Sequence, residues 1–149
     1  MIQAAYPYEQ ILPDRYVFVS AGKKLIQKMV KFQPTAQENI INMGFGDVLE
    51  DGSISDTINS NNGDMIRVLA TVIEILKDHT LNHPNKEIVF AGSTPERTKL
   101  YARILKTYYN EFSKDFHISV VTFSDHGIER IAFDTNQNTD YLAFLIKRF

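Results

Sequence analysis

The chain has 149 residues, of which 44% are hydrophobic and 23% are charged, and its formal net charge is −2. This length fits one domain with one core, so we expect residues 1–149 to form a single domain. The near-neutral charge argues against general binding to nucleic acid or acidic membranes. The sequence contains no cysteine, which excludes disulfides and thiolate metal sites.

The N-terminal residues Met1–Pro7 lack the basic start and the apolar run of a signal peptide. No apolar run in the sequence approaches the roughly 20 residues that are needed to span a bilayer. We therefore expect a soluble, cytoplasmic protein that does not associate with membranes.

The first sixty residues have the composition of β-strands. The third of the predicted strands contains Gly44 and Gly46, which in a strand suggest a bulge or a close approach of another backbone. The predicted strands are Tyr16–Val19, Leu25–Phe32, Ile40–Val48 and Ile54–Ile58.

Helical spacing of apolar residues begins at Met65. The preceding segment Asn61–Asp64 has side chains that are able to cap a helix, and Pro84 ends the predicted helix. A buried strand is predicted at Lys86–Ala91, followed by a second helix over Pro95–Asn110. The remaining strands are predicted at His117–Phe123, Ile128–Phe133 and Tyr141–Ile146. This order predicts an α+β fold, in which a mainly antiparallel sheet packs against two helices.

Arg97 is the most informative single residue, because it falls within the apolar stripe of the second predicted helix, beside Leu100 and Tyr101. A guanidinium does not lose its charge, so at a partly buried position it requires an anion. Arg97 also lies in the first helical turn, where unpaired backbone N–H groups favour negative charge.

The residues before Arg97 strengthen this interpretation. Gly92 would let a ligand approach the backbone, while Ser93 and Thr94 supply hydroxyl donors, so the loop predicts a phosphate or carboxylate site. The spacing matches neither GxxxxGK[ST] nor GxGxxG. The predicted ligand-binding residues are Gly92, Ser93, Thr94, Arg97 and Tyr101, together with Asp47, Asn62 and Asp64. In the structural alternative, Ser93 or Thr94 only caps the helix and Arg97 pairs with Asp47 or Asp64.

A second charged feature is the basic strip formed by Lys99, Arg103 and Lys106 on the exposed side of the same helix. Such a strip could contact a phosphate backbone, which makes single-stranded nucleic acid an alternative partner. The segment Asp47–Asp64 argues against this, since it carries five acidic residues and no basic one.

The sequence offers no catalytic constellation. His79 and His83 have helical i, i+4 spacing, but no third metal ligand is evident and Pro84 follows directly. No Ser–His–Asp arrangement or carboxylate pair can be assembled from the spacing. We therefore expect no metal and no cofactor, and we favour a protein without enzymatic activity.

Three stretches, SNNGDMIRVLATV, FAGSTPERTKLYARI and YLAFLIKRF, resemble a family of small uncharacterised proteins found mainly in Bacteroidota and described as a domain of unknown function. The family pattern places arginine where this chain has Lys99, which keeps the charge but loses the forked hydrogen bonds of arginine. The resemblance implies a bacterial, cytoplasmic protein and carries no assigned activity. The matching residues are Gly44–Asp47, Ser60–Asp64, Gly92–Thr94, Arg97, Thr98, Leu100, Tyr101 and Arg103.

Three functional hypotheses follow. The favoured one is a non-catalytic binding module that recognises an anionic, phosphate-bearing ligand or single-stranded nucleic acid at Gly92–Arg97. The second is an enzyme acting on a small phosphorylated or carboxylated substrate, with Arg97 and Ser93 as positioning groups and Asp47 or Asp64 as base. The third is a protein that forms a homodimer or pairs with another protein.

Overall fold

The computed structural model of the chain describes residues 5–55, 62–92, 94–136 and 140–149. Its elements follow one another in the order β1 (Tyr8–Leu12), β2 (Arg15–Ala21), β3 (Leu25–Pro34), β4 (Ile40–Val48), β5 (Ile54–Ser55), α1 (Met65–Asn82), β6 (Glu87–Phe90), α2 (Pro95–Thr107), α3 (Tyr109–Asp115), β7 (Phe116–Ser124), β8 (Gly127–Ala132) and β9 (Ala143–Arg148).

These strands form one sheet in the order β1-β2-β3-β4-β6-β9-β7-β8, with β5 paired to β4. Neighbours in the chain form antiparallel hairpins, such as β2–β3 and β7–β8. β4 and β6 run parallel, and α1 connects them as a crossover helix. The mainly antiparallel α+β fold predicted from the sequence is confirmed.

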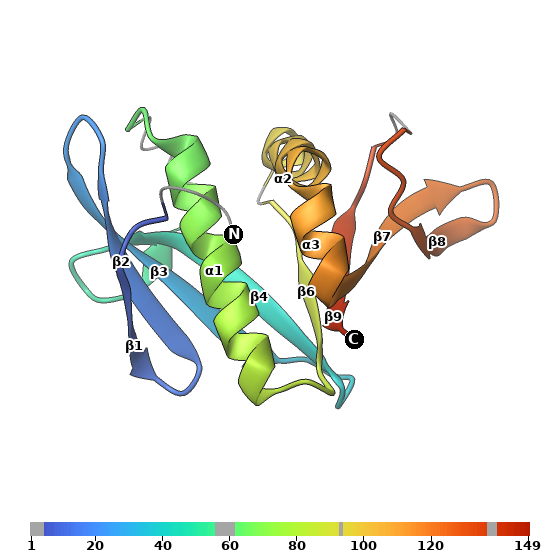
Figure 1. Cartoon of the computed structure of the whole chain (residues 1–149), viewed down its shortest axis with the longest axis horizontal. Helices are drawn as coiled ribbons and strands as arrows, with labels where there is room; N and C mark the ends of the chain where they lie inside the picture. The colour runs from blue at the N-terminus through green and yellow to red at the C-terminus, as the bar shows by residue number, and fades with distance from the viewer. Residues whose placement is uncertain (1–4, 56–61, 93, 137–139) are drawn as a thin grey trace.

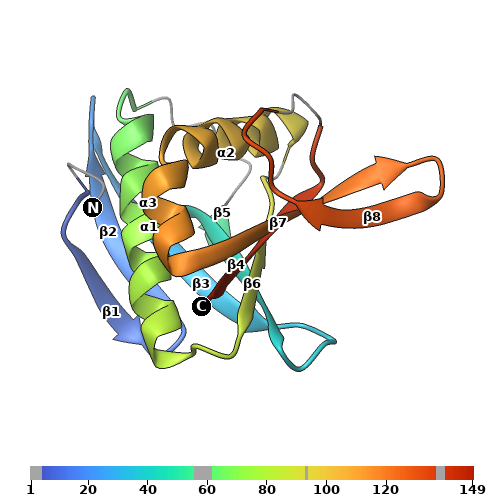
Figure 2. The same ribbon diagram turned by 45° about the vertical axis from the view of Figure 1, so that its right-hand side comes forward.

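All three helices lie on one face of the sheet (Figure 1). Side chains alternate along each strand, so Tyr16 and Phe18 of β2 are buried beneath the helices, whereas Arg15 and Val17 point the other way. We call this second surface the open face. The β7–β8 hairpin projects beyond the helices at one end of the sheet (Figure 2).

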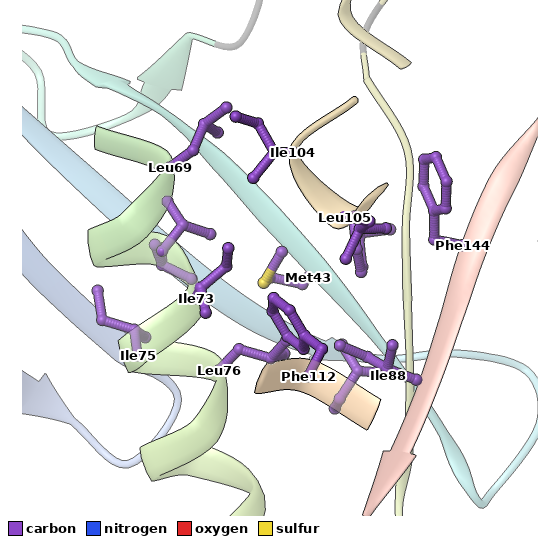
Figure 3. Packing of buried hydrophobic residues seen from close by; sticks show 14 of the residues in the cluster. Met43, Leu69, Ile73, Ile75, Leu76, Ile88, Ile104, Leu105, Phe112 and Phe144 are labelled. Atoms are coloured by element: carbon purple, nitrogen blue, oxygen red, sulfur yellow. The ribbon is translucent and has the colours of Figure 1, made fainter. Parts of the chain in front are cut away.

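The core lies between α1, the α2–α3 pair and the sheet. Ile73 and Leu76 of α1 point toward Met43 of β4, and Leu69 extends toward Ile104 of α2 (Figure 3). Ile104 and Leu105 of α2 and Phe112 of α3 close the same layer from the other side. The void that remains in this layer has a volume of about 20 Å³ and an entirely apolar lining, so it is a packing gap rather than a ligand site.

Two elements differ from the prediction. β1 was not predicted, because four of its five residues are exposed and it carries no alternating apolar signal; pairing with β2 creates it. The predicted helix Pro95–Asn110 is interrupted at Tyr108, whose backbone leaves helical geometry at φ −106° and ψ 19°. A third helix, α3, then turns Phe112 into the core.

Candidate functional site

The strand-to-helix loop before α2 has the local geometry that the sequence predicts. Thr94 caps the helix, its side chain accepting a hydrogen bond of 3.2 Å from the backbone N–H of Arg97, and Pro95 opens the first turn. The Arg97 side chain is half-buried, and Ser93 lies outside the described residues. The predicted cap is therefore confirmed. The Thr94 hydroxyl accepts a hydrogen bond from its own helix.

Gly92 is required by packing within the protein. A Cβ atom at this position would lie 2.5 Å from the backbone nitrogen of Thr98 and 2.6 Å from the Cβ of Arg97. The backbone N–H of Gly92 also donates to the Thr98 hydroxyl at 3.1 Å. The space left by the missing side chain is thus occupied by the start of α2, not open to a ligand as the sequence suggested.

Asp47 forms an ion pair with Lys28, and both residues are buried on the helix-covered face of the sheet. The two are cross-strand partners on β4 and β3. Asp47 is therefore the counter-charge of Lys28, and a role as a catalytic base would require breaking this buried pair.

Asn62 fastens the start of α1 to the β2–β3 hairpin. Its side-chain oxygen accepts from the backbone N–H of Lys24 at 2.8 Å, and its amide donates to the carbonyl of Lys24 and the hydroxyl of Ser20. The Asn62 backbone carbonyl would lie 1.9 Å from a Cβ atom at Gly22, so only glycine fits at that turn. These contacts are structural.

Asp64 stands at the N-cap of α1, but its carboxylate does not cap the helix, contrary to the prediction, and Asn61 of the predicted capping segment lies outside the described residues. It accepts hydrogen bonds from the hydroxyls of Tyr6 at 2.6 Å and Ser20 at 2.5 Å. Burial and the bond to Asp64 raise the pKa of Tyr6, whose ring also packs under the Arg67 guanidinium at 4.0 Å. Asp64 therefore ties the N-terminal segment to β2 and α1.

The other predicted residues are distributed over α2. Tyr101 packs edge-on against Phe90, with ring centroids 5.4 Å apart, and lines the apolar core. Of the basic strip, Lys99 and Arg103 are exposed and Lys106 is half-buried. Lys99 lies 3.8 Å from the Asp140 carboxylate, an exposed ion pair that contributes little to stability.

A cavity of about 440 Å³ opens on the open face, between β3, β4 and the turn into β5. Its volume is in the range of sites for small molecules, roughly 300–1,000 Å³. Neither this cavity nor the core void is lined by any of Gly92, Arg97, Asp47, Asn62 or Asp64. Its polar lining consists of Arg15, Lys31, Gln33, Asn42 and Ser53, and Met29 and Ile54 add apolar surface.

The cavity is electropositive. Arg15 and Lys31 are direct partners across β2 and β3, so their side chains project side by side from the open face. Among the described residues, no acidic side chain lines the cavity. The Asp14 carboxylate lies 3.9 Å from the Arg15 Nε atom, beyond hydrogen-bond distance, and the Asp51 carboxylate accepts a hydrogen bond of 2.6 Å from the hydroxyl of Ser53 at the edge of the cavity. That Nε atom is buried and has no hydrogen-bond partner in the part of the chain that the structure describes.

Glycine forms the floor of this cavity. Gly44 is the cross-strand partner of Lys31, and a Cβ atom added there would meet only the Lys31 carbonyl oxygen, at 3.9 Å. At Gly46, by contrast, the chain itself fills the space, since a Cβ atom would lie 2.4 Å from the carbonyl oxygen of Ser55. The close backbone approach expected for the two glycines is thus found at Gly46 and not at Gly44.

Sequence reasoning did not single out Arg15, Lys31, Gln33 or Asn42. The available signal was alternation, since Lys31 and Gln33 alternate with the buried residues Val30 and Phe32. The register between β2, β3 and β4, which the sequence does not specify, brings the four side chains together.

Across the described ranges, the structure contains no group of three or more His, Cys, Asp or Glu side chains placed to hold a metal ion. None of the helices in those ranges combines the length and the apolar character that crossing a bilayer requires.

Fold and site together define an α+β domain with an electropositive cavity on the uncovered face of its sheet. The chain belongs to a family of unknown function, DUF6934, whose family model matches residues 3–149. No curated protein and no solved structure matches the chain.

Proposed function

We propose that this protein is a non-catalytic binding domain for a small anionic ligand such as a phosphate-bearing molecule, and that the ligand occupies the open-face cavity. One observation carries the proposal: two cationic side chains, Arg15 and Lys31, stand directly opposite each other at a cavity that no acidic side chain of the described residues lines. Like charges directly opposite each other in a sheet repel, and an anion between them would remove the repulsion.

The loop at Gly92–Arg97 is the second candidate position for the same class of ligand. The half-buried Arg97 in the first turn of α2 favours it. Against it, the glycine gap is filled by Arg97 and Thr98, and the Thr94 hydroxyl is used as the helix cap. The cavity provides both room and charge, so we place the ligand there.

The enzymatic alternative has less support. Asp47 is held in a buried ion pair with Lys28, and Asp64 accepts hydrogen bonds from two hydroxyls. Both proposed bases are therefore engaged in holding the fold. A general base needs a free position within reach of the substrate proton.

The setting of the protein is part of the proposal. A cytoplasmic location in a member of the Bacteroidota is supported by the resemblance of its motifs and by a sequence without cysteine, which needs no oxidising compartment. A homodimer, or a complex with another protein, stays a prediction that light scattering at several concentrations would test.

Titration followed by two-dimensional ¹H–¹⁵N NMR distinguishes the two positions, because each contains glycines with separate signals. We expect phosphate, or a phosphorylated compound, to shift the amide signals of Gly44 and Gly52 at the cavity and to leave Gly92 unchanged. Shifts confined to Gly92 and Thr94 would move the site to the loop. The absence of shifts with phosphate, sulfate, small carboxylates and nucleotides would contradict anion binding altogether.

Substitutions test the same point by calorimetry. We expect Lys31→Gln to weaken anion binding by about ten-fold or more, since a charge-assisted hydrogen bond contributes roughly 1.5–3 kcal/mol. Arg103→Gln, which removes an exposed cation of the basic strip, is the matched control and should bind as the unmodified protein does. Equal losses in both variants would indicate nonspecific charge attraction instead.

The same pair of variants examines the nucleic-acid alternative. If single-stranded nucleic acid is the partner, mixed oligonucleotides should bind at low salt, affinity should fall steeply with added salt, and Arg103→Gln should weaken it. No binding at low salt would exclude nucleic acid as the partner.

A further inference from the structure

We infer that the ligand of the open-face cavity is a nucleotide, with its phosphate between Arg15 and Lys31 and its base lying over Gly44 against the amides of Gln33 and Asn42. This inference rests on the proposed function. Three features of the cavity indicate a nucleotide, because a simple anion would make no contact with them.

The first feature is the order of side chains across the strands. On the open face, Arg15, Lys31 and Gly44 form one cross-strand row, and Gln33 and Asn42 form the next. Lys31 and Asn42 are diagonal neighbours, which in a sheet places them roughly 7–8 Å apart. A cationic position and an amide position thus stand side by side, at a separation suited to a ligand with an anionic end and a polar, uncharged end.

The second feature is the glycine floor. Glycine inside a strand weakens it and often marks a bulge, a tight bend or a site where a ligand or another backbone approaches closely. At Gly46 the approaching group is β5 of the chain itself, whereas at Gly44 no described residue fills the space. A flat ring can lie against the backbone at Gly44 where a side chain would hold it away.

The third feature is the pair of amides. Gln33 and Asn42 are direct cross-strand partners, and both line the cavity. Within the described residues, neither side-chain amide has a hydrogen-bond partner, although Asn42 is half-buried. Each amide offers a donor and an acceptor, which is the pairing that Asn and Gln use to recognise nucleobase edges.

The remaining walls fit the same ligand. Met29, which is only 7% exposed, and Ile54 supply apolar contact at the opposite side of the glycine row. Ser53, in the turn before β5, also lines this side, and its hydroxyl donates to the Asp51 carboxylate at 2.6 Å. The lining is thus mostly polar, with apolar contact on one side.

The test is a calorimetric panel on the full chain with inorganic phosphate, ribose 5-phosphate, the four nucleoside 5′-monophosphates and the four nucleosides. We expect at least one nucleotide to bind about ten-fold tighter than ribose 5-phosphate and than its own nucleoside. Ribose 5-phosphate binding as tightly as every nucleotide would overturn the nucleotide inference and leave anion binding intact. Binding by no member of the panel would overturn both.

Two variants make the assignment specific. Asn42→Val removes an amide and keeps a residue favoured in strands, and it should lower the ratio of nucleotide to phosphate affinity by about ten-fold. Gly44→Val places a side chain where the base would lie and should lower the ratio by a similar factor. Arg103→Gln on α2 should leave this ratio unchanged. NMR spectra of each variant check that it is folded. An unchanged ratio in folded Asn42→Val and Gly44→Val would overturn the inference.

Discussion

Arg15 on β2 and Lys31 on β3 stand directly opposite each other and project from the same face of the sheet. Their repulsion is a cost to the unliganded fold, and it points to a position selected for binding rather than for stability. We expect Lys31→Gln to raise the free energy of unfolding by roughly 0.2–1 kcal/mol at low salt. Urea denaturation in a buffer without phosphate or sulfate measures this change.

The control variant for Lys31→Gln is Lys147→Gln, which also removes one positive charge from a strand. Lys147 is also an exposed lysine within a strand, but its cross-strand partners are the acidic Glu87 on β6 and His117 on β7. Its removal should not stabilise the protein. If Lys31→Gln lowers the free energy of unfolding as much as Lys147→Gln does, then Arg15 and Lys31 do not repel each other measurably. The pair would then no longer support a binding site at this position.

Gly44 and Gly46 provide a matched comparison two residues apart on β4. We expect Gly44→Ala to be neutral or to stabilise the protein by up to about 0.5–1 kcal/mol, because glycine within a strand costs about that much relative to alanine. We expect Gly46→Ala to destabilise it by about 1–3 kcal/mol, because its Cβ would collide with the Ser55 carbonyl. Thermal and urea unfolding distinguish the two. Equal effects would mean that Gly44 is also needed for packing.

We expect Asn62 to contribute to the stability of the protein and not to ligand binding. Asn62→Ala removes the acceptor for the Lys24 backbone N–H and the donor to the Lys24 carbonyl. The Lys24 backbone groups are only partly buried, so water replaces part of each lost bond and we expect a total loss of about 1–3 kcal/mol. Asn110→Ala, at an exposed helical position, should change stability by less than about 0.5 kcal/mol. Ligand affinity of the folded Asn62→Ala protein should be unaltered, since Asn62 does not line the cavity.

Much of the fold follows from local patterns. Helical periodicity and Pro84 predict α1, and Thr94 with Pro95 predicts the start of α2. β1 and the break at Tyr108 were missed because neither has a local signal: β1 is an exposed edge strand, and Tyr108 is flanked by neither proline nor glycine.

The site was harder to predict because it depends on pairing between strands. Arg15 and Lys31 are far apart in the sequence, and only the β2–β3 register places them opposite each other. Arg97, by contrast, stood out because a cation in an apolar stripe is visible locally. The glycine at position 92 has a similar local signature whether a ligand or a helix fills the space, and here the helix fills it.

His79 gives the protein a predictable response to acid. Its ring is buried near the end of α1, stacked on Phe32 at 3.8 Å, with Nδ1 3.2 Å from the Tyr16 hydroxyl. Burial, together with the neighbouring His83, lowers the pKa of His79 to about 4. The folded protein therefore keeps this imidazole neutral in a pH range where the unfolded chain protonates it.

The sign follows from proton binding. Between about pH 6.5 and pH 4 the unfolded chain binds more protons at this residue, so stability is full above pH 6.5 and falls as the pH drops toward 4. The loss attributable to His79 reaches about 3 kcal/mol, at 1.36 kcal/mol per pKa unit. Urea denaturation at several pH values should show this slope, and His79→Gln should remove most of it. His126→Gln, in the exposed β7–β8 turn, should retain it; an unchanged slope in His79→Gln would assign the acid response to other groups.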